Sequence, residues 1–141
     1  MPYTILEHTA DVRLLVEGRS LPELFSEALR GMMELLKPEG VSGESSAAEG
    51  TAETNRRIAI ASPSATALLV DFLNEALCLA YSHREMYQVS FEEVSEPRVR
   101  AVLRGRPVNS FGEDIKAVTY HEAEIRKNAA GNLETKLVFD L

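Results

Sequence analysis

The sequence is poor in residues on which several common kinds of site depend. Its 141 residues include one cysteine and no tryptophan. A single cysteine excludes an internal disulfide and any zinc site built on cysteines, so we expect Cys78 to be a small core or boundary residue. The sequence also contains no glycine-rich phosphate loop, no Gly-x-Ser-x-Gly elbow and no Cys/His metal spacing. Any chemistry must therefore depend on scattered polar side chains.

Basic residues are outnumbered by acidic ones. The 15 Lys and Arg residues against 22 Asp and Glu residues give a formal net charge of −7 at pH 7. This balance argues against a large phosphate-binding surface, because nucleic-acid affinity comes mostly from cationic contacts with phosphate. It fits a basic protein partner, a bound cation or simple solubility. The first residues, MPYTILEHTAD, have no basic region followed by an apolar run, which predicts no signal peptide and a cytoplasmic protein.

The segment Ala65–Ser82 is the element around which we expect the fold to be organised. Its few polar residues fall at helical spacing along one narrow stripe, and the other positions are apolar. Asp71 and Glu75 interrupt the apolar run, which is too short for a membrane span of ~20 residues, so no membrane contact is expected. Ser62–Ser64 (Ser-Pro-Ser) predicts a capping hydroxyl and a proline in the first turn of the helix.

Hydrophobic periodicity divides the remaining chain into one more helix and several strands. Ser20 and Glu23 have the spacing of a capping box, and apolar residues then recur every three or four positions up to Leu36. Strands are predicted at residues 3–6, 11–17, 57–61, 86–94, 98–104, 115–126 and 133–141, the last two joined by a hairpin at 128–132. The acidic segment 38–55 is predicted to be a mobile loop without chemistry. We therefore expect one α+β domain over residues 1–141, with two main helices packed on a mostly antiparallel sheet of about seven strands.

One dense basic cluster occurs in the predicted strands. Arg98, Arg100, Arg104 and Arg106 form it, and alternate positions of one strand carry the first three. Such a row can meet an acidic partner or an RNA backbone. A solvated strand face is the other interpretation, since exposed strands commonly carry charged rows.

Carboxylates lie at the ends of two predicted strands. Asp11 begins one strand, Asp140 closes another, and Leu141 carries the terminal carboxylate. If these two strands pair in antiparallel orientation, the three groups converge. Adjacent carboxylates raise one another's pKa unless a cation intervenes, and hard oxygen ligands suit Ca²⁺, Mg²⁺ or Mn²⁺ rather than zinc. The alternative is that Asp11 and Asp140 are ordinary exposed strand-end residues.

Three further polar residues are candidates for supporting roles. His8 precedes a turn, where a histidine can act as a ligand or base or can hydrogen-bond the backbone. His121 projects on the Thr119 side of its predicted strand, which favours a packed, hydrogen-bonded histidine. Lys116 shares a face with Val118, and its aliphatic stem can lie along that partly apolar surface.

Four motifs taken together resemble the archease family. They are His8–Val12 (HTADV), Leu68–Glu75 (LLVDFLNE), Ile115–His121 (IKAVTYH) and Val138–Leu141 (VFDL). The motifs occur in the family's order and spacing, which makes the combination specific although each alone is weak. The resemblance extends over nearly the whole chain and is interrupted mainly by residues 41–55.

The resemblance implies a small cytosolic cofactor protein of the RtcB-type tRNA-splicing ligase, which joins RNA ends with GTP and a divalent metal. Such a protein is not an enzyme. It promotes guanylylation and multiple turnover of the ligase, and it meets RNA only through that partner. The family's acidic metal site maps by motif onto Asp11, Asp140 and the terminal Leu141, with Ca²⁺ or Mg²⁺/Mn²⁺ as the expected cofactor. Lys116 and His121 match the central motif and, together with His8, are expected to be partner-contact or supporting residues.

The sequence departs from the family pattern at three places. Arg13 stands where glycine is expected, the loop Asn109–Gly112 lacks a histidine, and no tryptophan precedes the last strand. These departures leave the acidic set intact. Two other functions stay open: a chaperone-like modulator of tRNA-modifying enzymes such as tRNA methyltransferases, which would use the arginine strand and the first helix, and a metal-dependent hydrolase with His8 as its base.

Overall fold

The computed structural model describes residues 11–40 and 53–141. The predicted strand at 3–6 and the candidate residue His8 lie outside these ranges. The elements in chain order are β1 (Asp11–Gly18), α1 (Leu21–Leu36), β2 (Pro38–Glu39), β3 (Thr54–Ala61), α2 (Ala65–His83), β4 (Glu85–Ser95), β5 (Arg98–Pro107), β6 (Ser110–Phe111), β7 (Ala117–Thr119), β8 (Arg126–Lys127) and β9 (Leu133–Asp140).

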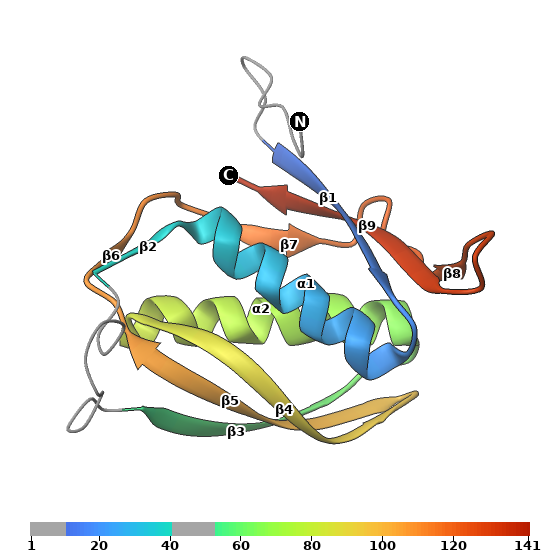
Figure 1. Ribbon diagram of the computed structural model, residues 1–141, viewed down its shortest axis with the longest axis horizontal. Coiled ribbons are helices and arrows are strands. Elements are labelled where there is room, and N and C mark those ends of the chain that lie inside the picture. Colours follow the sequence, from blue (N-terminus) through green and yellow to red (C-terminus); the bar gives the residue numbers. More distant parts are fainter. Residues whose placement is uncertain (1–10, 41–52) are drawn as a thin grey trace.

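The two helices lie between two antiparallel sheets (Figure 1). One sheet has the order β1-β9-β7, with β8 also paired to β9, and the other has the order β3-β5-β4. A short β2–β6 pair lies apart from both. The helix α1 packs against β1 and β4, and α2 packs against β4 and β7. The predicted α+β class, with two helices on antiparallel sheet, is therefore confirmed. The strands form two main sheets rather than one, and the helices lie between them.

The first helix follows from its caps and its apolar stripe. The backbone N–H of Glu23 donates to Ser20 Oγ at 3.3 Å, which satisfies one of the free donors of the first turn. At the other end Lys37 adopts the left-handed conformation with φ of 53° and closes the helix. The buried positions repeat every three to four residues and are Leu24, Phe25, Ala28, Leu29, Met32, Met33 and Leu36.

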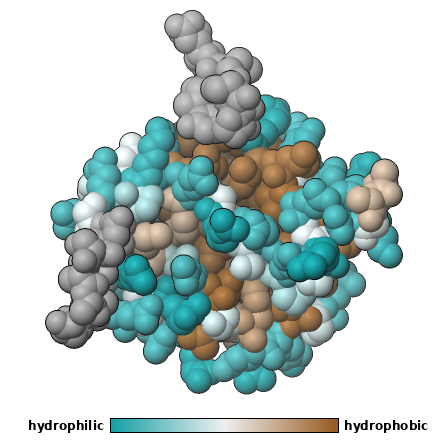
Figure 2. Space-filling model, viewed as in Figure 1, coloured by the Kyte–Doolittle hydropathy of each residue, from teal (hydrophilic) through white to brown (hydrophobic). Residues whose placement is uncertain are grey.

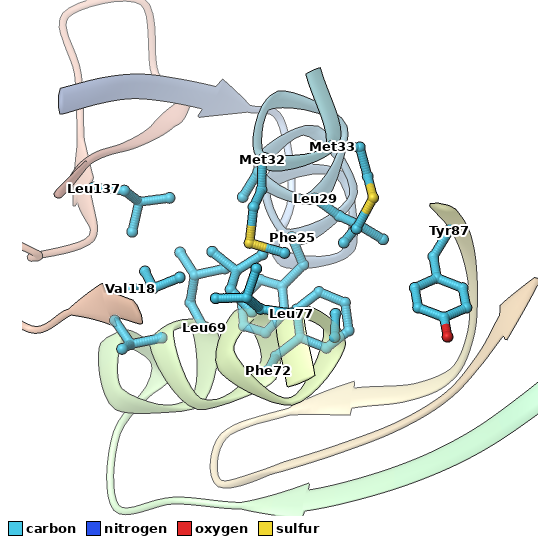
Figure 3. Packing of buried hydrophobic residues seen from close by; sticks show 14 of the residues in the cluster. Phe25, Leu29, Met32, Met33, Leu69, Phe72, Leu77, Tyr87, Val118 and Leu137 are labelled. Atoms are coloured by element: carbon cyan, nitrogen blue, oxygen red, sulfur yellow. The ribbon is translucent and has the colours of Figure 1, made fainter. Parts of the chain in front are cut away.

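The second helix is the central element of the core, as its composition predicts. Its N-cap is Ser64, whose Oγ accepts from the N–H of Ala67 at 3.1 Å. Pro63 precedes the cap and is not in the first turn, which corrects the expectation from sequence. The helix is long and apolar enough to cross a membrane by length and composition, as core helices can be. Here it packs against strands of both sheets, and Phe72 meets Phe25 of α1 with ring centroids 5.6 Å apart (Figure 3).

The last strand joins the two ends of the chain. β9 pairs with β1 along its whole length, and the register sets Asp11 opposite Asp140. Side chains alternate as predicted: Leu137 and Phe139 are buried toward the helices, whereas Lys136 and Asp140 are exposed on the outer face. The condition on which the acidic site depends, that the first and last strands lie side by side, is therefore met.

The predicted long strand at 115–126 is wrong. It is broken into β7 and β8 by a turn in which Glu122 has a positive φ of 65°. Hydroxyl groups replace strand pairing across the gap, because Thr135 Oγ1 accepts from Glu124 N–H at 3.1 Å and Thr66 Oγ1 accepts from Ile125 N–H at 3.1 Å. The predicted hairpin at 128–132 is confirmed, since β8 and β9 flank it and Gly131 supplies a positive φ of 85°.

The predicted loop at 38–55 is shorter at both ends than its composition suggests. Pro38 and Glu39 form β2, which pairs with Phe111 and Ser110. Thr54 begins β3 and donates its hydroxyl proton to Glu85 at 3.0 Å. These contacts come from distant parts of the chain, so the local composition does not predict them. Residues 41–52 lie outside the described part of the chain.

Candidate functional site

Two pairs of carboxylates stand opposite each other on the outer face of β1 and β9. Asp11 faces Asp140 near one end of the strand pair, and Glu17 faces Glu134 near the other. Directly opposed residues of antiparallel strands have Cβ atoms ~4.5–5.5 Å apart, where like charges destabilise the sheet. Each pair therefore brings two negative charges close together, at two places on one surface.

The glutamate pair is satisfied by amide side chains of the following hairpin. Asn128 Nδ2 donates to Glu17 at 2.8 Å and to Glu134 at 3.0 Å, and Asn132 Nδ2 donates to Glu17 at 2.8 Å. These hydrogen bonds hold the pKa of Glu17 below its usual value, and the bond from Asn132 has the largest effect. No cation is needed here, because the protein itself supplies the donors.

The aspartate pair lacks such donors. Within residues 11–40 and 53–141, the only basic side chain within 4 Å of the Asp11 carboxylate is Arg13, whose Nη1 lies 3.6 Å away, and no side chain donates a hydrogen bond to the Asp140 carboxylate. The backbone N–H of Lys116 donates instead to the carbonyl oxygen of Asp140 at 2.7 Å. Lys116 is thus held next to Asp140, with its own side chain exposed, and the half-buried Leu141 follows directly.

A carboxylate that the sequence did not single out, that of Glu122, gathers basic side chains from β1, β9 and the turn after β7. Glu122 accepts from Arg13 Nε at 3.3 Å and from Arg13 Nη2 at 3.2 Å. His121 Nε2 lies 3.5 Å from the same carboxylate, and Lys136 Nζ lies 4.0 Å from it. The hydrogen bond from Arg13 is the main cause of the lowered pKa of Glu122. The sequence carries no signal for this role, because Glu122 and Arg13 are 109 positions apart.

The expected positions of the supporting residues are only partly right. His121 lies on the turn after β7 with its side chain 71% exposed, so the expectation of a packed histidine on a strand face is wrong. Lys116 is likewise exposed, next to the buried Val118 side of β7. Both side chains are exposed at the surface.

Polar residues of α2 hold the strand that borders the site. Asn74 Nδ2 donates to the carbonyl of Val118 at 2.8 Å, and Asn74 Oδ1 accepts from the N–H of Val118 at 2.9 Å. Asp71 accepts from Ser62 Oγ at 2.5 Å and from the Tyr120 hydroxyl. The polar stripe on α2 therefore anchors β7 and its following turn, and Ala117 of β7 pairs with Asp140.

An open groove of about 740 Å³ runs along the same outer face. Leu15 forms part of its wall and is 65% exposed, and Figure 2 shows hydrophobic residues gathered over β1 among mostly hydrophilic surroundings. The groove occupies the side of β9 where β7 and β8 are interrupted. Its lining residues are Leu15, Glu122, Ala123, Glu124, Arg126, Glu134, Thr135 and Lys136.

The donor set at the aspartate pair suits a hard divalent cation. No group of three His, Cys, Asp or Glu side chains that could hold a metal gathers in the described part of the chain. What the two aspartates offer is a pair of opposed carboxylates on one face of the strand pair. Both are oxygen ligands, which Ca²⁺, Mg²⁺ and Mn²⁺ prefer. A cation would also remove the repulsion that the register imposes on the two aspartates.

Comparisons with known proteins identify the family and the fold of the chain. The model of the "Archease protein family (MTH1598/TM1083)" matches residues 3–141. The protein named archease from Methanosarcina acetivorans is 35% identical, with 92% of this chain and 89% of the relative covered. The protein of the same name from Methanosarcina mazei is 34% identical over the same shares.

Two solved structures have the same fold. The solution structure of Methanobacterium thermoautotrophicum protein 1598 matches with a TM-score of 0.69 at 23% identity, covering 96% of each chain. The crystal structure of an archease, described as a possible chaperone, from Thermotoga maritima matches with a TM-score of 0.66 at 21% identity, covering 98% of this chain and 96% of that one. With the family model and the Methanosarcina relatives, these matches show that the chain belongs to the archease family.

Proposed function

We propose that this protein is a non-catalytic activator of the RtcB-type tRNA-splicing RNA ligase in the cytoplasm. It would promote guanylylation of the ligase with GTP and its multiple turnover through an acidic divalent-metal site. The observation that carries the proposal is the register of β1 and β9, which sets Asp11 opposite Asp140. Among residues 11–40 and 53–141, no amide side chain satisfies this pair as Asn128 satisfies the glutamate pair.

The proposed site would hold a divalent cation between Asp11, Asp140 and the carboxylate of Leu141. When bound, such a cation neutralises and positions phosphate oxygens. Arg13 and Glu122 fix the turn beside the site through their paired hydrogen bonds. Lys116 and His121, both exposed, are the proposed contacts to the ligase. A protein without a nucleophile can accelerate another enzyme's reaction in this way, because positioning alone lowers a barrier.

The decisive experiment measures ligase guanylylation with GTP at fixed ligase concentration. Asp11→Asn and Asp140→Asn should each reduce stimulation by at least about tenfold. Loss of a residue that only supports a metal ligand already costs about 10- to 100-fold, and these two are proposed as ligands themselves. Glu17→Gln and Glu134→Gln are the matched controls, since they remove the same charge from the same face, and they should leave stimulation unchanged. Equal stimulation by all five proteins would refute the metal-site mechanism.

A second candidate is a chaperone-like modulator of tRNA-modifying enzymes such as tRNA methyltransferases. The description of the Thermotoga maritima structure as a possible chaperone favours it. In that case the chain should suppress heat-induced aggregation of a tRNA methyltransferase, measured by light scattering, and Asp140→Asn should suppress it as well as the wild type. Loss of suppression in Asp140→Asn would instead tie both activities to the acidic site.

A further inference from the structure

The outer face of the β3-β5-β4 sheet carries a row of guanidinium groups. The helices cover the other face of this sheet, where Val99, Ala101 and Leu103 are buried. Exposed arginines stand at every outward position of β5 from 98 to 106 except Val102, which gives intervals of ~6.6 Å within each pair and ~13 Å across Val102. Arg57 of β3 pairs with Val102 and extends the row sideways. The five arginines of this face are Arg57, Arg98, Arg100, Arg104 and Arg106.

The carboxylates on this face leave most of that charge available. Glu92 lies 2.6 Å from Arg57 and 4.0 Å from Arg100, and Glu93 lies 3.8 Å from Arg100. Exposed ion pairs of this kind contribute ~0–1 kcal/mol, so a polyanion can displace them. The other three arginines have no carboxylate partner within residues 11–40 and 53–141, and Arg104 contacts only the Gln88 amide, at 3.3 Å.

The uncharged residues of the face indicate the kind of partner. Most side chains in the middle of the face are small, with Ala59, Ser90 and Val102 among them, and no aromatic residue of β3, β4 or β5 lies on it. Stable protein interfaces depend on large buried anchors such as Tyr, Trp and Met. Proteins that bind single-stranded nucleic acid stack its bases on aromatic rings. On this face Met86, opposite Arg106, is the one such side chain and is already half-buried, and no aromatic ring of the three strands lies there. Backbone contacts to a double helix need only cations on an accessible surface.

We propose that this arginine face binds the phosphate backbone of helical RNA, without sequence preference. The contact would be the chain's own, which revises the expectation that RNA is reached only through the ligase. The net charge of −7 does not exclude it, because the five positive charges are concentrated on one face. The contact requires no ligase and no metal, so it stands or falls separately from the proposed activator role.

The experiment measures binding of the isolated protein to a fluorescent RNA hairpin by anisotropy, in EDTA. The wild type should bind with a dissociation constant of roughly 1–100 μM at low salt, and log K should fall with log salt with a slope of about −3 for three to four phosphate contacts. The test variant is Arg100→Glu/Arg104→Glu. The control is Arg30→Glu/Arg126→Glu, which reverses two exposed arginines elsewhere and gives the same net charge of −11 (−7 − 4).

The test variant should bind at least tenfold more weakly than the control. Circular dichroism checks that both double variants are folded. If Arg100→Glu/Arg104→Glu is unfolded, Arg98→Gln/Arg104→Gln takes its place. Equal weakening in both double variants would mean that binding follows net charge only and would overturn the proposal. So would tighter binding to a DNA duplex than to the RNA hairpin, or binding of polyglutamate in preference to RNA, since the latter would identify an acidic protein as the partner.

Discussion

Asp11 on β1 and Asp140 on β9 are directly opposed across an antiparallel pair, and both side chains lie on the outer face of the sheet. Six residues further along β1, Glu17 and Glu134 are opposed in the same way. Amide groups of the hairpin satisfy the glutamates, and no equivalent donors reach the aspartates within the described residues. The two pairs form an internal comparison that makes the proposed cation site testable without the ligase.

Divalent cations should stabilise the wild type. A cation that binds only the folded state at 100 times its dissociation constant raises the free energy of unfolding by ~2.7 kcal/mol. Thermal unfolding in Ca²⁺, Mn²⁺ or Mg²⁺ against EDTA measures this effect. Asp140→Asn should abolish the shift, whereas Glu134→Gln should retain it.

The same substitution should have the opposite effect in EDTA. Because like charges directly opposed across strands are destabilising, Asp140→Asn should raise the free energy of unfolding by ~0.2–1 kcal/mol when no cation is present. Urea unfolding at neutral pH gives this value. If Asp140→Asn is destabilised in EDTA and unaffected by cations, the aspartates are not a cation site.

The link between α2 and β7 should contribute to stability through Asn74. Its amide exchanges two hydrogen bonds with the backbone of Val118, and truncation leaves a buried N–H and C=O without partners. Asn74→Ala should therefore cost ~1–3 kcal/mol in the free energy of unfolding. Amide hydrogen exchange at Val118 should quicken accordingly. The adjacent exposed Glu75 gives the control, since Glu75→Ala should change stability by less than ~0.5 kcal/mol.

Local signals in the sequence predict the helices and the faces of β9. Caps and apolar repeats are properties of neighbouring residues, so the helix from Leu21 to Leu36 could be located before the structure was known. Strand parity likewise assigns Phe139 to the core and Asp140 to the surface. Their positions at strand ends, and then the motif resemblance, predicted that Asp11 and Asp140 converge, and the register sets them opposite each other.

Long-range contacts account for what the sequence did not predict. At the break between β7 and β8, the hydroxyls of Thr135 and Thr66 accept from backbone N–H groups 11 and 59 positions away. Glu122 becomes the partner of Arg13 only because that break turns it toward β1. The residues at 115–126 favour a β-strand and do not predict either contact. The exposure of His121 follows from the same turn.

Tyr120 should titrate above the ordinary range for a phenol. Its hydroxyl donates to Asp71, and this hydrogen bond is the main cause of its raised pKa. Because the folded-state pKa is raised, the stabilisation is fully present below the unfolded-state value near 10 and is lost as pH rises through the folded-state value. Ultraviolet difference titration of wild type against Asp71→Asn measures the shift. The phenol should titrate at lower pH in Asp71→Asn, and identical curves would contradict the assignment.

A buried ion pair in the other sheet should control stability in acid. The Glu85 side chain is only 6% exposed and accepts from Arg56 Nε at 2.8 Å and from the Tyr87 hydroxyl at 2.8 Å. Burial acts to raise the pKa of Glu85, but the hydrogen bonds from Arg56, Tyr87 and Thr54 together hold it below its usual value. Burial and the same bond to Glu85 raise the pKa of Tyr87, so the phenol stays protonated as a donor.

Removing one partner should therefore be costly. Arg56→Ala leaves the carboxylate buried without its cation and should lower the free energy of unfolding by ~3 kcal/mol. Glu85→Gln should cost less, since the more exposed Arg56 regains contact with water. A depressed folded-state pKa gives stability that is present above the unfolded-state pKa and lost as pH falls through the folded-state value. Urea midpoints measured between pH 7 and pH 3 should thus fall less steeply for Glu85→Gln than for the wild type, and parallel curves would show that other carboxylates govern acid unfolding.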